Sequence, residues 1–193
     1  MPEREETGDL ETEGRQSKKE AFDAIVLALK DKENVNILFV CSANICRSPY
    51  AEMRFEQLMR TTSCSKTINV ASGGFTSSVT MHPFTMQALL DAGVPAERID
   101  RFSPRNMRKH KDELESADLI LVPSNEVISM MPRKYLEKTF LLSEAVSGAK
   151  VDINDPVLLK EYEPYKAIVD HLDGYLVGIA RILQETWACP NES

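Results

Sequence analysis

The sequence lacks any long run of apolar residues, and this excludes a membrane-spanning protein. No stretch reaches the roughly 18 apolar residues that a spanning helix requires. The first 20 residues are charged and have no apolar core of the kind that a secretory signal carries. We therefore expect no membrane span and a cytoplasmic location.

Cysteine is also scarce, since the 193 residues contain only Cys41, Cys46, Cys64 and Cys189. An intracellular chain of this length does not need disulfides to fold, so catalytic or buried thiols are the better interpretation. The cysteines show no spacing with the three histidines that is typical of a zinc site. We expect no metal, and we expect the histidines to be surface or packing residues.

Positive charge is in deficit: 23 Lys and Arg stand against 30 Asp and Glu, for a net charge of -7. An acidic surface repels nucleic-acid phosphates, so we expect no nucleic-acid partner. It would also repel a phosphorylated ligand, so a phosphate site in this chain must be local and preorganised.

What the sequence does contain is an alternation of short apolar runs and amphipathic stretches. We predict a disordered acidic tail over 1–16, an amphipathic helix extension over 17–34 and one domain over 35–188. The predicted strands are 35–40, 67–71, 119–122 and 139–142, and the predicted helices are 50–60, 83–92, 107–115, 124–131 and 165–187. This order predicts an α/β fold, with a small parallel sheet of about four strands and helices on both faces.

The stretch that carries chemistry follows the first predicted strand of this domain. That strand delivers Cys41 to the carboxyl edge of the sheet, where open α/β sheets place ligands. A short loop then enters a helix at Ser48 and Pro49, with Ser48 expected as the N-cap. Loop N–H groups and the fork of Arg47 can surround an anion, and the same positive field favours the nucleophilic thiolate. The alternative, a buried and inert thiol at Cys41, stays open at this point.

Residues 40–49, V-C-S-A-N-I-C-R-S-P, closely resemble the V-C-x-G-N-x-C-R-S-P signature of low-molecular-weight protein tyrosine phosphatases. Asp155-Pro156 matches the Asp-Pro pair that supplies the family's general acid, 114 residues after Cys41. Residues 71–74 resemble the family's Ser-Ala-Gly segment, and 117–121 resemble its next strand. The resemblance covers about 35–187 and implies the phosphotyrosine phosphatase I-like (flavodoxin-like) fold.

The resemblance implies a role for each matching residue. Cys41 would attack phosphorus, Arg47 would hold the phosphoryl oxygens and Asp155 would protonate the leaving group. Asp152 is a nearby competitor for that role, and Asp155 could also be a simple turn residue. Phosphate binding and loop support would fall to Ser42, Ala43, Asn44, Ile45, Cys46, Ser48 and Ser72. No organic cofactor is implied, and Cys46 could form a reversible disulfide with Cys41.

The sequence departs from the family at three places that bear on substrate. Ala43 replaces the usual loop glycine, which is tolerable if its φ is negative. Val157 and Leu158 stand where the family usually has aromatics, which leaves Phe75 as an aromatic candidate for the pocket wall. No histidine corresponds clearly to the family's loop-supporting one.

The leading hypothesis is a protein-tyrosine-phosphate phosphatase with a phosphorylated protein as partner. Ile45 supports it, since tyrosine-directed members typically carry Ile there and protein-arginine phosphatases carry Thr. The alternatives are a protein-arginine phosphatase, a thiol-dependent arsenate reductase and a phosphate-binding regulatory module without turnover. An arsenate reductase typically needs a nearby downstream pair of cysteines, and no cysteine lies between Cys64 and Cys189. The sequence does not indicate an oligomeric state.

Overall fold

The computed structural model describes residues 7–60 and 66–188, and it contains a four-stranded parallel sheet. The strand order is β2-β1-β3-β4. The strands are β1 (Asn34–Cys41), β2 (Thr67–Gly74), β3 (Leu119–Val122) and β4 (Thr139–Leu141). This arrangement confirms the predicted fold class.

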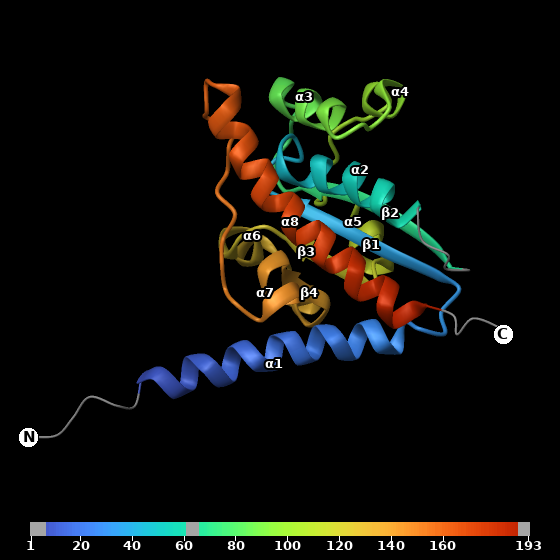
Figure 1. Ribbon diagram of the computed structural model, residues 1–193, viewed down its shortest axis with the longest axis vertical. Helices are drawn as coiled ribbons and strands as arrows, with labels where there is room; N and C mark the ends of the chain where they lie inside the picture. Colours follow the sequence, from blue (N-terminus) through green and yellow to red (C-terminus); the bar gives the residue numbers. More distant parts are fainter. Residues whose placement is uncertain (1–6, 61–65, 189–193) are drawn as a thin grey trace, which may run out of the picture.

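Helices alternate with these strands along the chain (Figure 1). The helices are α1 (Thr7–Ala28), α2 (Arg47–Arg60), α3 (Pro83–Asp91), α4 (Ala96–Asp100), α5 (Lys111–Ser116), α6 (Asn125–Met130), the 3-10 helix η1 (Arg133–Lys138), α7 (Leu142–Ser147) and α8 (Tyr162–Trp187). The long predicted helices exist, and α8 begins three residues before the predicted start at 165. The short elements α4, η1 and α7 were not predicted, because segments of five or six residues are too short to show a helical period.

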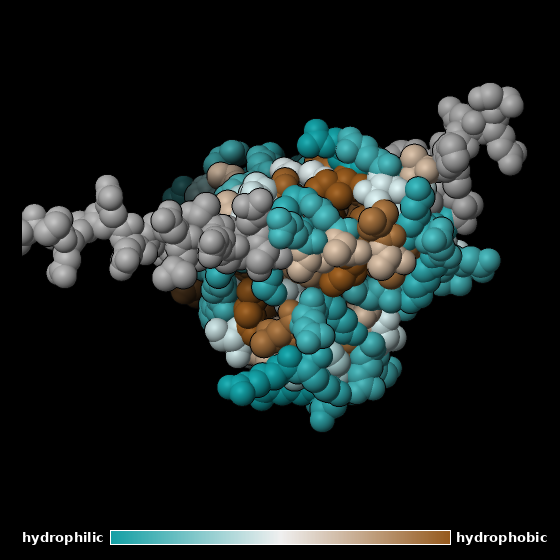
Figure 2. Space-filling view, turned by 90° about the horizontal axis from the view of Figure 1, so that it is seen from below, coloured by the Kyte–Doolittle hydropathy of each residue, from teal (hydrophilic) through white to brown (hydrophobic). Residues whose placement is uncertain are grey.

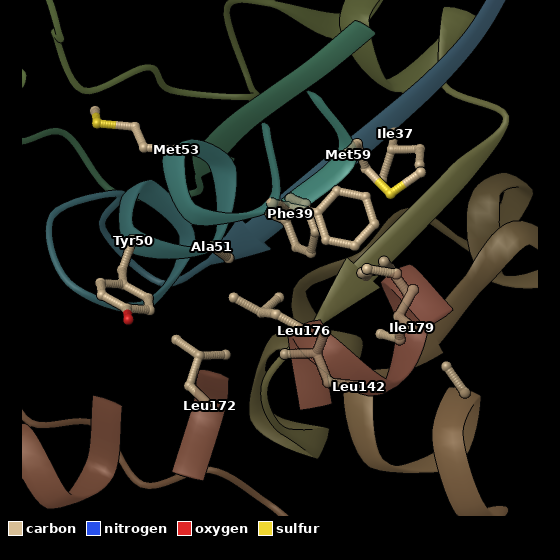
Figure 3. Packing of buried hydrophobic residues seen from close by; sticks show 14 of the residues in the cluster. Ile37, Phe39, Tyr50, Ala51, Met53, Met59, Leu142, Leu172, Leu176 and Ile179 are labelled. Atoms are coloured by element: carbon tan, nitrogen blue, oxygen red, sulfur yellow. The ribbon is translucent and has the colours of Figure 1, made fainter. Parts of the chain in front are cut away.

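Strand β3 is apolar throughout and β1 is mostly apolar, because helices cover both faces of the sheet at these two strands. On one face, Ile37 and Phe39 of β1 pack in the cluster that includes buried residues of α1, α2 and α8. On the other, Leu38 and Val40 pack with residues of α5, α6 and η1. Figure 3 shows the first cluster, in which side chains of β1, α2 and α8 meet, with Leu176 of α8 among them.

Helix α1 runs along the molecule beside α7 and α8 (Figure 1). Its Phe22 and Val26 are fully buried, and Phe22 meets the ring of Phe140 edge-on at 5.5 Å between centroids. The Val26 carbonyl accepts a 2.8 Å hydrogen bond from the indole of Trp187. Figure 2 looks onto this face and shows apolar side chains on both sides of the helix.

The N-terminal boundaries differ from the predicted ones. Helix α1 begins at Thr7, inside the stretch assigned to the tail, and ends at Ala28, before the predicted 34. Lys66, just before β2, donates to the Leu29 carbonyl at 3.1 Å and so ties the chain after the helix end to the start of β2. Residues 1–6 lie outside the described residues, and the division into tail, extension and domain stays a prediction.

Helix α5 is shorter than the predicted helix 107–115. Residues 105–107 instead pair with Gly74 at the end of β2: Gly74 N–H donates to the Arg105 carbonyl at 2.9 Å, and Met107 N–H donates to the Gly74 carbonyl at 2.8 Å. These backbone bonds hold the segment extended, so the helix begins only at Lys111.

Across the described part of the chain, no helix combines the length and the apolar character that crossing a membrane would need. The same residues contain no group of three or more His, Cys, Asp or Glu side chains that could hold a metal ion.

Candidate active site

Cys41 ends β1 at the carboxyl edge of the sheet, and its side chain is enclosed by the loop that follows. It is 3% exposed. Its Sγ lies 3.0 Å from the Ser48 hydroxyl and accepts a hydrogen bond from the Asn44 backbone N–H at 3.3 Å. Two donors can therefore stabilise negative charge on this sulfur.

Asn44 holds the loop together from its centre. Its backbone has φ of 55°, a left-handed conformation that asparagine tolerates better than most residues. The side-chain amide donates to Ser48 Oγ at 2.9 Å and to Ser72 Oγ at 2.8 Å, and its Oδ1 accepts from the Arg105 backbone N–H at 2.8 Å. The buried amide is thus fully engaged, and it ties the loop to β2 and to the segment after α4.

Glu52 anchors this network from α2, and the sequence analysis did not single it out. The carboxylate is 4% exposed and accepts from Ser72 Oγ at 2.5 Å and from Arg98 at 2.5 Å. Burial raises the pKa of Glu52, while Ser72 and the two arginines Arg98 and Arg105 oppose the rise. The available signal was its spacing, because Glu52 lies on the same helix face as Ser48, Phe55 and Met59.

The direction of the hydrogen bonds follows from Glu52. Glu52 accepts from Arg98 and also from Ser72, so the single Ser72 proton is donated to Glu52. Ser72 must then accept from Asn44, and Asn44 donates onward to Ser48. This leaves the Ser48 proton free for Cys41 Sγ or for the Gly73 carbonyl at 3.2 Å. Helix α2 begins at Arg47, so Ser48 lies in its first turn and is not the predicted N-cap.

Gly74 permits the close approach of β2 to the loop. A Cβ at this position would stand 2.6 Å from the Asn44 backbone nitrogen and 2.8 Å from the Ala43 carbonyl carbon. Among the described residues, Asn44 is the sole non-glycine residue with positive φ, so Ala43 has a negative φ. Ala43 therefore fits this loop position, where an alanine in place of glycine requires a negative φ.

Arg47 brings the two ends of the site together, since it contacts both the loop and the segment that contains Asp155. Its guanidinium is 3% exposed and donates to the Ile153 carbonyl at 2.9 Å, to Asp155 Oδ2 at 2.6 Å and to Ser42 Oγ at 3.4 Å. Its Nε is buried and forms no hydrogen bond with any residue that the structure describes. An oxyanion bound in the loop would satisfy this donor.

The two aspartates that competed for the acid role lie in different surroundings. Asp155 contacts Arg47, and its Oδ1 accepts from the Val157 N–H at 3.2 Å. Asp152 is exposed and accepts from both the backbone and the side chain of Asn125 at 2.9 Å. Of the two, only Asp155 contacts a member of the loop.

Cys46 lies in the same loop, and its thiol is buried against Tyr165. It is 3% exposed and hydrogen-bonded to Tyr165. Burial raises the pKa of its thiol to about 12, against the opposing hydrogen bond from Tyr165. Tyr165 in turn lies 2.6 Å from the hydroxyl of Thr85 and has its own pKa raised by burial.

The residues near the loop that could shape a pocket are not those expected. Phe75 is 5% exposed and packs in the second core cluster, so it is a core residue and not a pocket wall. His82 donates its backbone N–H to the Ile45 carbonyl at 3.0 Å and stacks on Tyr165 at 4.9 Å between centroids. Ile45 itself is half-buried, and Leu158, which follows the Asp-Pro pair, is 80% exposed.

The structure therefore places all ten sequence-predicted residues in or beside one loop. They are Cys41, Ser42, Ala43, Asn44, Ile45, Cys46, Arg47, Ser48, Ser72 and Asp155. Cys64 and Cys189 lie outside the described residues. Glu52, Arg105 and Ile153 are the contributors that sequence reasoning missed.

Comparisons with known proteins agree on one family. A family model for low molecular weight phosphotyrosine protein phosphatase matches residues 36–188. A protein-arginine-phosphatase of Bacillus subtilis is 30% identical over 156 residues, which are 78% of this chain and 98% of the relative. A solution structure of a low molecular weight protein tyrosine phosphatase from Bacillus subtilis has a TM-score of 0.64 at 29% identity, covering 78% of this chain and 98% of that one. A structure of the arginine phosphatase YwlE, a variant whose active-site serine is phosphorylated, has a TM-score of 0.68 at 28% identity, with coverage of 78% and 97%.

Proposed function

The chain belongs to the low-molecular-weight phosphotyrosine protein phosphatase family, and on that premise we propose that it dephosphorylates protein side chains through a phosphocysteine on Cys41. The observation that carries this proposal is the position of Cys41 Sγ, between the Asn44 N–H and the Ser48 hydroxyl and in the same loop as Arg47. Such a loop can bind a phosphoryl group, and it points two hydrogen-bond donors at the sulfur that would attack it.

In the first step, the Cys41 thiolate attacks phosphorus, a P–S bond forms and the bond to the leaving atom breaks. Arg47 holds the phosphoryl oxygens, using the buried Nε that forms no hydrogen bond within residues 7–60 and 66–188. Asp155 gives its proton to the leaving atom. The proposal thus requires Asp155 to leave its ion pair with Arg47 and to carry a proton when the substrate is bound.

In the second step, water attacks phosphorus, Asp155 takes a proton from that water, and the P–S bond breaks. The Ser48 hydroxyl donates to the departing sulfur, as the hydrogen-bond directions set by Glu52 and Asn44 allow. Products are inorganic phosphate and the regenerated thiolate.

We propose phosphotyrosine as the substrate side chain. The support is Ile45, a half-buried apolar residue in the loop, at the position where the family's tyrosine-directed members typically carry Ile. Phosphoarginine is the second candidate, and a specific observation favours it: the curated relatives from Bacillus subtilis and Geobacillus stearothermophilus are protein-arginine-phosphatases.

The test of the chemistry is hydrolysis of 4-nitrophenyl phosphate by the wild type, Cys41→Ser and Asp155→Asn. We expect turnover by the wild type, none by Cys41→Ser, and a loss of about 10²–10⁴ in Asp155→Asn, the usual contribution of a positioned acid. A folded wild type that binds phosphate or vanadate without turnover would support a binding module instead.

The test of the substrate uses peptides of one sequence that carry phosphotyrosine or phosphoarginine. We expect the wild type to favour phosphotyrosine, and Ile45→Thr to shift the ratio of the two kcat/KM values towards phosphoarginine. A wild type that cleaves phosphoarginine and leaves phosphotyrosine and 4-nitrophenyl phosphate untouched would reverse the assignment. The cytoplasmic location is part of the proposal and is checked by cell fractionation.

A further inference from the structure

A cationic segment stands out in this acidic protein. Residues 101–111, which connect α4 to α5, contain five Lys or Arg side chains and no Asp or Glu, in a chain of net charge -7. Arg105 uses its charge internally, because it pairs with Glu113 at 3.1 Å. The other four, Arg101, Arg108, Lys109 and Lys111, are exposed and form no ion pair with any residue in the described part of the chain.

This segment is bonded directly to the phosphate-binding loop. The Arg105 backbone N–H donates to Asn44 Oδ1 at 2.8 Å, and residues 105–107 pair with Gly74. Phe75 and Thr76, which follow Gly74, donate their N–H groups to the Ser42 carbonyl of the loop at 2.8 and 2.9 Å. Arg108, Lys109 and Lys111 therefore come one to four residues after Met107, whose backbone is bonded to Gly74 beside the loop.

The neighbouring wall of the site adds no charge that would cancel these cations. The segment 75–82 after β2 contains no Asp, Glu, Lys or Arg, and its Ser77 hydroxyl accepts a 3.0 Å hydrogen bond from Asn106 of the cationic segment. Met107 is fully buried and anchors the segment, so the exposed cations on both sides of it have a fixed place beside the loop.

We propose that Arg108, Lys109 and Lys111 form a docking surface for acidic residues that flank the phosphorylated side chain of a protein substrate. The inference rests on the proposed function and adds to it the charge of the preferred substrate. Exposed cations beside the site attract an acidic segment and orient it, whereas the rest of the acidic surface repels it. An extended peptide advances about 3.3–3.6 Å per residue, so residues a few positions from the phosphorylated one would reach this surface.

The experiment compares two phosphopeptides, one with Asp and Glu around the phosphorylated residue and one with Ser and Gln, together with 4-nitrophenyl phosphate. The variant is Arg108→Gln/Lys109→Gln/Lys111→Gln. The control, Lys30→Gln/Arg133→Gln/Arg181→Gln, changes the net charge equally at exposed sites in the turn after α1, on η1 and on α8. The phosphorylated residue is the one that the wild type cleaves best, so either outcome of the substrate test leaves the comparison of the two peptides valid.

We expect the wild type to prefer the acidic peptide by roughly tenfold in kcat/KM, the combined effect of three exposed charge pairs. The triple variant should lose this preference, while its activity on 4-nitrophenyl phosphate and the activity of the control are unchanged. The wild-type preference should also vanish at about 1 M ionic strength, where the Debye length is about 3 Å.

An unchanged preference in the triple variant would overturn the proposal, while activity on 4-nitrophenyl phosphate would show that the proposed chemistry still holds. Equal activity of the wild type on both peptides, with inhibition by a short oligonucleotide that the triple variant escapes, would assign the cations to nucleic acid and also overturn it.

Discussion

Asp155 accepts a 2.6 Å hydrogen bond from Arg47, so the candidate general acid and the candidate phosphate ligand form an ion pair with each other. The two residues are 108 positions apart in the chain. A phosphoryl group requires the same guanidinium, so Asp155 and the substrate compete for Arg47. Binding of the substrate would release Asp155 toward the leaving group.

This competition predicts opposite effects of Asp155→Asn on binding and on turnover. Turnover falls, as stated above, but inorganic phosphate should bind about two- to fivefold more tightly, because a partly exposed ion pair is worth about 0.5–1 kcal/mol. Phosphate affinity is measured by calorimetry, with Asp152→Asn as the control near wild type in both respects. Weaker phosphate binding by Asp155→Asn would show that the ion pair does not oppose the ligand.

Gly74→Ala should abolish activity, and this loss should be larger than the loss of stability alone would cause. The new Cβ would meet the Asn44 nitrogen at 2.6 Å and push the phosphate-binding loop out of position. The matched control is Gly174→Ala on α8, where no atom lies within 4 Å of the added Cβ and alanine should stabilise the exposed helix by about 0.4–1 kcal/mol. Both variants are compared by kcat and by urea unfolding. Full activity of Gly74→Ala would mean that the loop can shift without loss.

Alkaline pH should destabilise the protein through buried groups beside the loop. The pKa of Cys46 is raised from 9.0 to about 12 in the folded protein, so the unfolded chain loses this proton first. The resulting stability is fully present below about pH 9 and is lost as the pH rises towards about 12, by at most about 4 kcal/mol for a shift of three units. Urea unfolding at about pH 8 and pH 10.5 measures the loss.

The variant Cys46→Ala isolates the contribution of this thiol. Its stability should fall less between the two pH values than that of the wild type, although Tyr165, whose pKa burial also raises, still contributes. An identical fall in the variant and the wild type would assign the whole effect to other groups.

Phe22→Ala should destabilise the phosphatase domain although α1 lies outside the part that matches the family model. Phe22 is 0% exposed and packs on Phe140 of β4, and removing such a ring costs about 3–5 kcal/mol. In a chain of this size that lowers Tm by roughly 6–20 °C. Leu27→Ala is the control, because Leu27 is 61% exposed on the same helix. An unchanged Tm for Phe22→Ala would mean that α1 does not contribute to the folded core.

Local pattern predicted the long elements because each carries its own signal. Val35–Val40 is an apolar run broken only by Asn36, and the apolar stripe of α8 repeats every three or four residues, so the burial of both could be predicted without knowledge of their partners. The start of α5 could not be predicted, since it depends on backbone bonds from residues 105–107 to Gly74, about 30 positions away. Phe75 was misread for the same reason: an aromatic residue next to the loop was expected in the pocket, but Met107 and Leu38 enclose it.

The sequence by itself determined the α/β class and the loop from Cys41 to Ser48, because the residues of the candidate site are nearly all consecutive and follow one buried strand. It also indicated Asp155, through the Pro that follows it. Only the tertiary structure decided that Arg47 pairs with Asp155, that Glu52 sets the hydrogen-bond directions through Ser72, and that the cations of 101–111 lie beside the loop. These relationships join residues from different elements, and a pattern along one chain carries no signal for contacts that form only when the elements pack.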